Sequence, residues 1–275
     1  MKKLSDVIVG FIGAGNMGFT LAKVAAKVIP GTRILLTNRS LEKTAKAAVE
    51  IGATALASNT ELTQKSDVIF LGVKPYQIEA VLGEIAGNLG GKIVVSMAAG
   101  VSFESIRSHI GQAAHPAALV RISPNTPACV GEGMTALAVD NDSAESLEAA
   151  ELVTALLASG GRVEAVPETL LTCVGAVSGC GPAYGFVFIE ALADAAVALG
   201  MPRRQAYIYA AQTLKGAATL TLESGDHPGV LKDAVCSPGG TTIEALRVLE
   251  ERGFRAAIIN AVHAAARKTA ELGKK

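Results

Sequence analysis

The chain has 275 residues, of which half are hydrophobic and 18% are charged, and its 25 lysines and arginines balance its 25 acidic residues. This length allows one large or two modest domains with a substantial core. A net charge near zero without a dense basic run argues against nucleic-acid binding. The four histidines and four cysteines lack the spacing of zinc ligands, so we expect no metal site. The cysteines fit free or buried thiols of a cytoplasmic protein.

The first elements predict a dinucleotide-binding fold. Residues 7–12 are apolar and β-prone, which is typical of a buried strand, and apolar residues at helical spacing follow the glycines after it. In this context Gly13 permits a tight turn, Gly15 lets the backbone approach a pyrophosphate, and Gly18 allows close packing of helix and strand. The alternative is a plain glycine-rich turn. The residues expected at the cofactor here are Gly13, Ala14, Gly15, Asn16, Met17 and Gly18.

The end of the second strand predicts which cofactor binds. Residues 33–37 fit this strand, and Asn38, Arg39 and Ser40 follow it. A site for NADH usually carries an acidic residue about 20 positions after the glycines, where it binds the ribose 2′-hydroxyl. A guanidinium and a hydroxyl would instead bind a 2′-phosphate. These three residues therefore predict NADPH, with NADH as a weaker second cofactor; the alternative for Arg39 is a solvated surface charge.

Further strands are expected at residues 68–73, 93–96, 119–122 and 135–139, before a helix over residues 143–158 that two glycines end. Small or turn-forming residues follow the strands, at the sheet edge where ligands of open α/β sheets bind. Lys74 could meet a phosphate or the nicotinamide amide there, or be only a surface lysine. The edge residues expected at the cofactor are Val73, Lys74, Pro75, Ala98, Ala99 and Gly100. We assign residues 1–166 to a Rossmann-like, doubly wound α/β domain.

The remainder, residues 167–275, predicts an all-α domain for substrate binding and dimerisation. Residues 170–189 carry no charge and are long enough to span a bilayer, but glycines and a proline interrupt them, so we expect helices buried against protein. Several helices are apolar on both sides, which is more than a small domain can bury alone. We therefore expect a homodimer at least. The expected helices cover residues 168–178, 182–199, 203–224, 228–235, 241–252 and 254–272.

The most distinctive loop spans residues 236–244. Pro238 cannot donate a backbone N–H, and the two glycines after it can take conformations closed to other residues. Thr241 and Glu244 match a capping box, which predicts the start of a helix. Backbone N–H groups and hydroxyls at the positive end of a helix suit a small anion such as a carboxylate. An ordinary capped turn is the alternative.

Taken together, these motifs resemble the pyrroline-5-carboxylate reductase family over nearly the whole chain. The resemblance implies a Rossmann-like domain followed by a helical domain that intertwines with a partner, with decamers common. It also implies reduction of L-Δ1-pyrroline-5-carboxylate to L-proline by NAD(P)H, the last step of proline synthesis. It is carried by residues 10–18, Val73-Lys74-Pro75, Ala98-Ala99-Gly100, Pro124-Asn125-Thr126-Pro127, and the more specific blocks Ser178 to Tyr184 and Leu231 to Thr242.

The same resemblance implies roles for single residues. The loop binds the substrate carboxylate, Thr242 lies near the ring nitrogen as the catalytic residue, and Asn59 and Glu168 match positions on the cofactor side. The chain has Cys180 where the family often has serine, and Ala234 where it often has asparagine, so fine contacts there can differ while the reaction does not. The substrate-binding residues implied are Ser237, Pro238, Gly239, Gly240, Thr241 and Thr242.

The chemistry of a cyclic imine fits these residues. Hydride from C4 of the nicotinamide attacks the C=N carbon, and Thr242 would hydrogen-bond the nitrogen or hold a water that does. One alternative is a β-hydroxyacid dehydrogenase, which relies on a lysine of the helical domain; none occurs between Arg162 and Lys215. The other is a non-enzymatic NADP-sensing protein, since fold alone does not establish catalysis. The hydroxyls of Ser237 and Thr241 argue against a sensor that has lost its second pocket.

Overall fold

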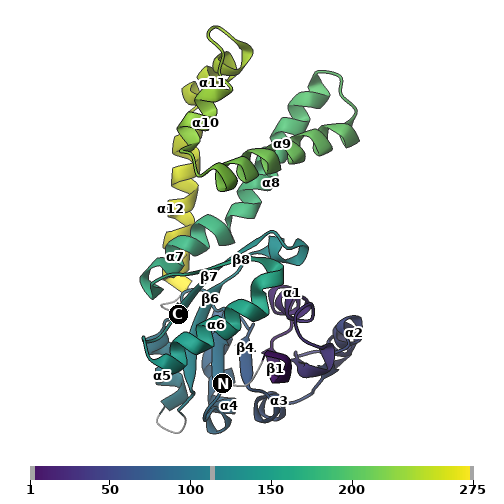
Figure 1. The fold of residues 1–275 in the computed structure, drawn as a ribbon, viewed down its shortest axis with the longest axis vertical. Coiled ribbons are helices and arrows are strands. Elements are labelled where there is room, and N and C mark those ends of the chain that lie inside the picture. The colour runs from purple at the N-terminus through teal and green to yellow at the C-terminus, as the bar shows by residue number, and fades with distance from the viewer. Residues whose placement is uncertain (1–3, 112–114, 273–275) are drawn as a thin grey trace. The chain divides into compact units, whose positions relative to one another are not determined.

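The computed structural model describes residues 4–111 and 115–272 (Figure 1). An eight-stranded sheet is its largest element, in the order β3-β2-β1-β4-β5-β6-β7-β8. β6 and β7 pair antiparallel and the other neighbours pair in parallel, so the doubly wound prediction is confirmed. The strands are β1 (Val9–Ile12), β2 (Ile34–Thr37), β3 (Thr54–Ala55), β4 (Val68–Leu71), β5 (Ile93–Ser96), β6 (Ala118–Ser123), β7 (Gly133–Val139) and β8 (Gly161–Ala165).

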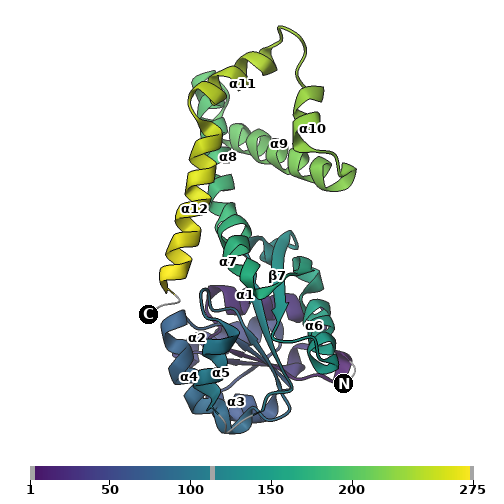
Figure 2. The same cartoon turned by 90° about the vertical axis from the view of Figure 1, so that its left-hand side faces the viewer.

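Helices cover both faces of this sheet, which explains why its central strands are apolar throughout. Phe11 and Phe70 stack at 4.7 Å between ring centroids on one face, while Ile12 and Leu71 belong to the core on the other. Figure 2 shows α6 on the opposite side of the sheet from α4 and α5. The first face packs against α1 (Asn16–Ala25), α2 (Leu41–Ile51) and α6 (Ala144–Leu157), and the second against α3 (Asn59–Lys65), α4 (Ile78–Ile85) and α5 (Phe103–Ile110).

Two strands were not predicted from the sequence. β3 has only two residues, too few for a visible pattern. β8 begins at Gly161, which was expected only to end a helix. The φ of Gly161 is +128°, and a Cβ added there would lie 2.1 Å from the Gly133 carbonyl oxygen, so only glycine lets β8 approach β7 this closely. The strand is an exposed edge with polar side chains, and it therefore lacks the apolar run that marks the central strands.

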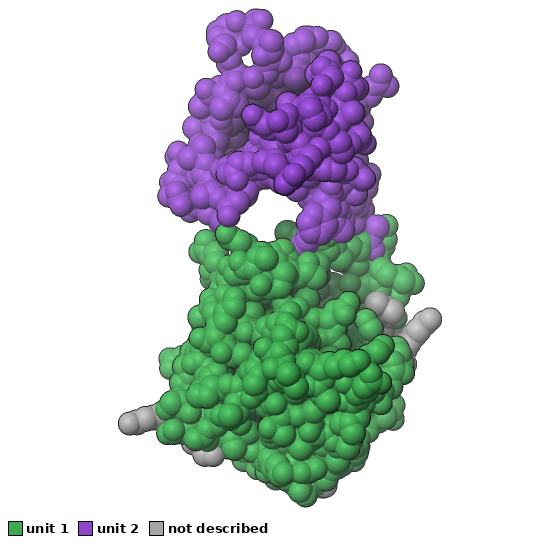
Figure 3. All heavy atoms as spheres, turned by 90° about the vertical axis from the view of Figure 1, so that its right-hand side faces the viewer, with its two compact units in different colours: residues 1–180, 265–275 green, residues 181–264 purple. Residues whose placement is uncertain are grey.

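The chain divides into two compact units, residues 1–180 with 265–275, and residues 181–264 (Figure 3). The first helical turns after Pro167 belong to the unit that contains the sheet, because Leu171 is buried in its core. This division differs from the predicted domains, 1–166 and 167–275, which remain a prediction about function and folding. The link between the units begins with a 3-10 turn (Glu168–Leu170), α7 (Leu171–Val174) and a π-helix (Gly175–Gly179).

The second unit is entirely helical, as predicted. Among its residues, all of which the structure describes, Ala193, Ala206 and Ala210 are the buried hydrophobics, and they lie where α8 packs against α9. Within one chain, Leu171 and Ala176 are the buried residues of segment 170–189, so the expected burial of its other residues against protein stays a prediction. The segment Glu168–Ala198 is long and apolar enough to cross a membrane, with a mean hydropathy of 1.4. The helices are α8 (Gly181–Ala198), α9 (Arg203–Ser224), α10 (Pro228–Ala234), α11 (Thr241–Glu251) and α12 (Phe254–Leu272), whose last turns belong to the first unit.

Candidate active site

Two adjoining pockets of the first unit lie along the carboxyl edge of the parallel strands. The β1–β2 pocket, of about 350 Å³, is formed by the turn after β1, the end of β2 and the residues after β4. The β5–β6 pocket, of about 490 Å³, extends from the ends of β4, β5 and β6 to residues 171–180. Gly72, Val73 and Lys74 line both pockets. Each pocket has the volume of a small-molecule site, and their shared wall suits a ligand with two ends.

The glycines after β1 shape the β1–β2 pocket. Gly13 has a φ of +87°, and a Cβ added to it would lie 2.7 Å from Val73 Cγ1. A Cβ on Gly18 would lie 2.4 Å from the Gly13 carbonyl oxygen, so the predicted turn and the close helix packing are both confirmed. A Cβ on Gly15 would meet no described atom within 4 Å, which leaves open space in front of α1. The first amides of α1 have no partner inside the helix and lie at its positive end, which favours an anion.

The three polar residues after β2 have different surroundings. Asn38 Nδ2 donates to the Ala14 carbonyl oxygen at 3.2 Å, and its Oδ1 accepts from the Arg39 amide at 2.8 Å. The Asn38 side chain therefore connects β2 to the glycine turn. Ser40 is the N-cap of α2, where its Oγ accepts from the Lys43 amide at 3.3 Å. Arg39 is exposed and lines the pocket, so its guanidinium is available to a phosphate there, as is the Lys74 ammonium group of the same lining.

Asn59, at the start of α3, lines the same pocket between two polar partners. Thr37 Oγ1 donates to Asn59 Oδ1 at 2.7 Å, and Asn59 Nδ2 donates to Glu84 Oε2 at 2.8 Å. These bonds determine which way the amide is turned and hold α3 against the end of β2.

The β5–β6 pocket contains a buried charge that sequence reasoning missed. Arg121 is 8% exposed and lines this pocket. Its Nη1 donates to Glu168 Oε1 at 2.5 Å, and the same oxygen accepts from the Phe103 amide at 2.7 Å. A signal was present, since an arginine inside the apolar stretch of residues 119–122 needs a buried partner. The predicted residues that line this pocket are Met17, Val73, Lys74, Pro75, Ala98, Ala99 and Gly100.

The loop of residues 237–242 belongs to the second unit. The predicted helix start is confirmed, because α11 begins at Thr241. The predicted capping box is wrong: Gly240 is the N-cap, and the Glu244 carboxylate bonds to Arg247, which lowers the pKa of Glu244. The Gly240 amide donates to the Ser237 carbonyl oxygen at 3.0 Å, which closes a tight turn in which Gly239 has a φ of +66°. Thr242 is half-buried, while Ser237, Pro238, Gly239 and Thr241 are exposed.

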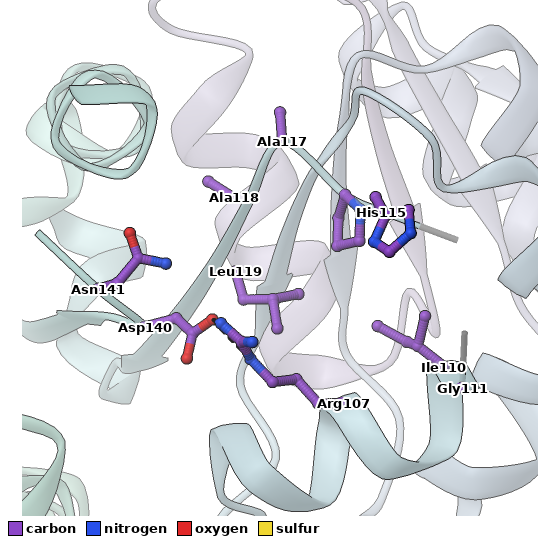
Figure 4. A pocket seen from close by; sticks show the side chains of 10 residues that line it. Arg107, Ile110, Gly111, His115, Ala117, Ala118, Leu119, Asp140 and Asn141 are labelled. Carbon is purple, nitrogen blue, oxygen red and sulfur yellow. Dashed lines mark hydrogen bonds and ion pairs between the residues drawn. The ribbon is translucent and has the colours of Figure 1, made fainter. Parts of the chain in front are cut away.

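A third pocket, of about 270 Å³, lies at the opposite, amino edge of the sheet, between the end of α5 and the start of β6. Figure 4 shows Arg107 and Asp140 pointing towards each other in it, and Arg107 Nε donates to Asp140 Oδ2 at 2.9 Å. Its described lining residues do not include any of the predicted site residues. Within residues 4–111 and 115–272, no group of three histidine, cysteine or acidic side chains could hold a metal ion. All four cysteines are described, and they are free thiols that are exposed or half-buried.

Two family models match the chain. One, described as pyrroline-5-carboxylate reductase dimerisation, matches residues 168–272, and one described as NADP oxidoreductase coenzyme F420-dependent matches residues 8–100. The pyrroline-5-carboxylate reductase of Escherichia coli (strain K12) is 44% identical over 275 residues, which cover 97% of this chain and 98% of that protein. That of Arabidopsis thaliana is 39% identical over 269 residues, which cover 97% and 95%.

Solved structures agree with these relatives. The NADP-bound pyrroline carboxylate reductase of Plasmodium falciparum is 30% identical, with a TM-score of 0.89 over 98% of this chain and 100% of that one. The pyrroline-5-carboxylate reductase of Coxiella burnetii is 34% identical, with a TM-score of 0.86 over 98% and 99%. The similarity therefore extends over both units and both ends of the chain.

Proposed function

Because this chain belongs to the pyrroline-5-carboxylate reductase family, it reduces L-Δ1-pyrroline-5-carboxylate to L-proline with NADPH, and we propose which of its residues carry out the reaction. The observation that carries the function is full-length similarity: the Escherichia coli reductase is 44% identical and covers 97% of the chain. A β-hydroxyacid dehydrogenase or a cofactor sensor would not match reductases of one named activity over both units. This reaction is the final step of proline biosynthesis.

The cofactor site that we propose follows the carboxyl edge of the sheet. The adenosine end lies in the β1–β2 pocket, where Arg39 binds the 2′-phosphate and the amides at the start of α1 bind the pyrophosphate. The open space at Gly15 and the exposed guanidinium of Arg39 support this placement. The nicotinamide end lies in the β5–β6 pocket, against Ala98, Ala99 and Gly100. Lys74, which lines both pockets, is suited to the phosphates between these two ends.

The substrate carboxylate is bound, in this proposal, by the loop from Ser237 to Thr242. Its turn places backbone amides and hydroxyls at the start of α11, and the first amides of that helix have no helical partner. The carboxylate of the imine supplies the negative charge that such a site favours. The exposure of Ser237 and Thr241 leaves their hydroxyls accessible to a ligand.

The chemistry needs one hydride and one proton. NADPH, when bound, supplies the hydride to the imine carbon, and the C=N π electrons become the lone pair of a nitrogen that gains the proton. We assign Thr242 the hydrogen bond to that nitrogen, either directly or through a water. A positioned acid–base group contributes roughly 10²–10⁴-fold. Holding the ring against the nicotinamide in the reactive orientation contributes more, and it is the main task of the loop and the β5–β6 pocket.

We further propose that the chain works in the cytoplasm as a homodimer at least, with larger assemblies such as decamers built from dimers. The matching family model for residues 168–272 describes dimerisation, and the second unit leaves most of its large apolar side chains exposed. The four free thiols fit a reducing compartment. We expect neither a nucleic-acid partner nor a membrane partner, because a second copy of the chain accounts for the apolar surface.

A direct assay tests the function. NADPH absorbance is followed after addition of pyrroline-5-carboxylate, the experiment is repeated with NADH, and the product is identified as L-proline by amino-acid analysis. We expect turnover with both cofactors and a higher kcat/KM with NADPH. Binding of NADPH without consumption of the imine would contradict the assignment and support a sensor.

A further inference from the structure

Part of one wall of the β5–β6 pocket is made of backbone. The π-helix Gly175–Gly179 lies in this wall, and its first and last residues, both glycines, line the pocket. π-Helical turns are rare and often occur at functional sites. Since these glycines carry no side chain, any displacement of the π-helix changes the pocket directly.

The carbonyl group of Ser178 in this π-helix has no α-helical donor. In an α-helix the N–H of the residue four positions later would bond to it. That residue is Pro182, which has no N–H. A donor from another part of the fold can replace the missing α-helical bond at this break, because an unpaired and partly buried carbonyl costs free energy.

Asn125 supplies that donor. Its Nδ2 donates to the Ser178 carbonyl oxygen at 3.0 Å, and its Oδ1 accepts from the Met134 amide at 2.9 Å. The side chain is largely removed from solvent, since Asn125 is 8% exposed. It lies just after β6, and Met134 is in β7, so one carboxamide joins the rigid sheet to the break in the helix.

We propose that Asn125 is a positioning residue for hydride transfer. Its carboxamide replaces the helical donor that Pro182 removes, and it holds the π-helix where the nicotinamide ring and the imine can meet. Asn125 does not line the pocket among the described residues, so it acts through the Ser178 carbonyl. The inference rests on the proposed placement of the nicotinamide in the β5–β6 pocket. A misplacement of about 1 Å can cost roughly 10²-fold in rate.

The test is a double-mutant cycle with Asn125→Ala and Pro182→Ala. We expect Asn125→Ala to lower kcat by about 10–100-fold. The Kd of NADPH, measured by fluorescence titration, should change little because the contacts at Gly15 and Arg39 remain. Pro182→Ala restores an N–H four residues after Ser178, so in this background the loss of kcat caused by Asn125→Ala should be only a few-fold. The melting temperature should not recover fully, because the Met134 amide still lacks its acceptor.

Two further variants keep the test decisive. Asn125→Asp has the same shape and keeps an acceptor for the Met134 amide but offers the Ser178 carbonyl no donor at neutral pH, so it should also lower kcat, and it replaces Asn125→Ala if that protein does not fold. Ser159→Ala is the matched control, because Ser159 Oγ donates to the Val24 carbonyl oxygen at 2.9 Å away from the pocket. It should lower the melting temperature and leave kcat unchanged.

Either of two results would overturn the inference. One is an unchanged kcat in both Asn125 variants, and the other is an equal loss of kcat with and without Pro182→Ala. Failure of the proposed function would look different, because the unmodified protein would then not reduce pyrroline-5-carboxylate at all.

Discussion

The two units of this chain bury apolar side chains to very different extents. In the first, Phe11 and Phe70 stack inside a core that helices close on both sides. In the second, large side chains such as Phe186, Val187 and Ile208 lie exposed on helices whose buried hydrophobic residues, within residues 181–264, are three alanines. The pattern of apolar residues therefore indicates where helices and strands form. It does not indicate whether their apolar faces are buried by the same chain. The proposed homodimer would cover these exposed apolar side chains with a second copy of the chain.

The largest expected effect comes from placing a charge on an exposed apolar residue in each unit. Val187 in α8 is 65% exposed, and Val49 in α2 is 83% exposed, so the pair is matched in type and setting. Val187→Asp should abolish the oligomer and lower turnover by about 100-fold or more, because a carboxylate buried in an apolar interface costs several kcal/mol. Size-exclusion chromatography with light scattering and the NADPH assay measure the two effects.

Val49→Asp is the control and should change neither property. An oligomer that survives Val187→Asp would show that this face of α8 remains exposed in the assembly. Dissociation of both variants would show that added charge, rather than position, separates the subunits.

The parts of the fold that local sequence determines were predictable. The strand before Gly13 and the glycines after it form the expected turn and helix start, because each requirement acts within a few residues. The helices of the second unit begin and end close to their predicted positions because prolines and glycines mark their ends. Even so, the cap of α11 differs from the predicted one, since the Arg247 guanidinium competes successfully for the Glu244 carboxylate.

Features that depend on distant partners were not predictable. β8 depends on Gly161 approaching Gly133, a contact between residues far apart in the chain. The pair of Arg121 and Glu168 joins residues that are 47 positions apart. The substrate loop was recognised as an anion site, but its link to catalysis came from resemblance to a family and remains a prediction.

A smaller effect is expected when the proposed catalytic residue of the second unit is changed, and it separates catalysis from cofactor binding. Thr242→Ala in the second unit should lower kcat by about 10²-fold, because it removes the hydroxyl assigned to the ring nitrogen. The Kd of NADPH should stay the same, since the proposed cofactor contacts are in the first unit. Thr221→Ala is the matched control, because this hydroxyl in α9 only donates to the Ala217 carbonyl oxygen. Steady-state kinetics and NADPH titration separate the outcomes, and an unaltered kcat for Thr242→Ala would rule out the assigned role.

A change in the first unit should instead affect the choice of cofactor. Arg39→Glu should lower the ratio of kcat/KM for NADPH over NADH by about 10–100-fold, because a charge-assisted bond to the 2′-phosphate becomes a repulsion. The KM for pyrroline-5-carboxylate should change little. Lys46→Glu alters the net charge equally on the outer side of α2, where Lys46 pairs with Glu42, and should leave the ratio unchanged. A cofactor ratio that is the same in both variants would mean that Arg39 does not reach the phosphate.

The smallest expected contrast concerns two ion pairs, Arg121 with Glu168 in the first unit, which is largely removed from solvent, and Arg247 with Glu244 in the second, which is exposed. The Arg247 guanidinium bonds to Glu244 and lowers the pKa of this carboxyl below its ordinary value of 4.5. A carboxyl whose pKa is lower in the folded state stabilises the fold above the unfolded pKa and loses this contribution as the pH falls through the folded pKa. Glu244→Gln should therefore be slightly less stable than the unmodified protein at neutral pH, and the two unfolding midpoints should converge in acid. High salt should remove the difference at neutral pH, since the pair is exposed and screened. Should the two proteins differ equally at every pH and salt concentration, Glu244 would act through its shape or its helix position, and the exposed pair would not contribute to the stability of the second unit.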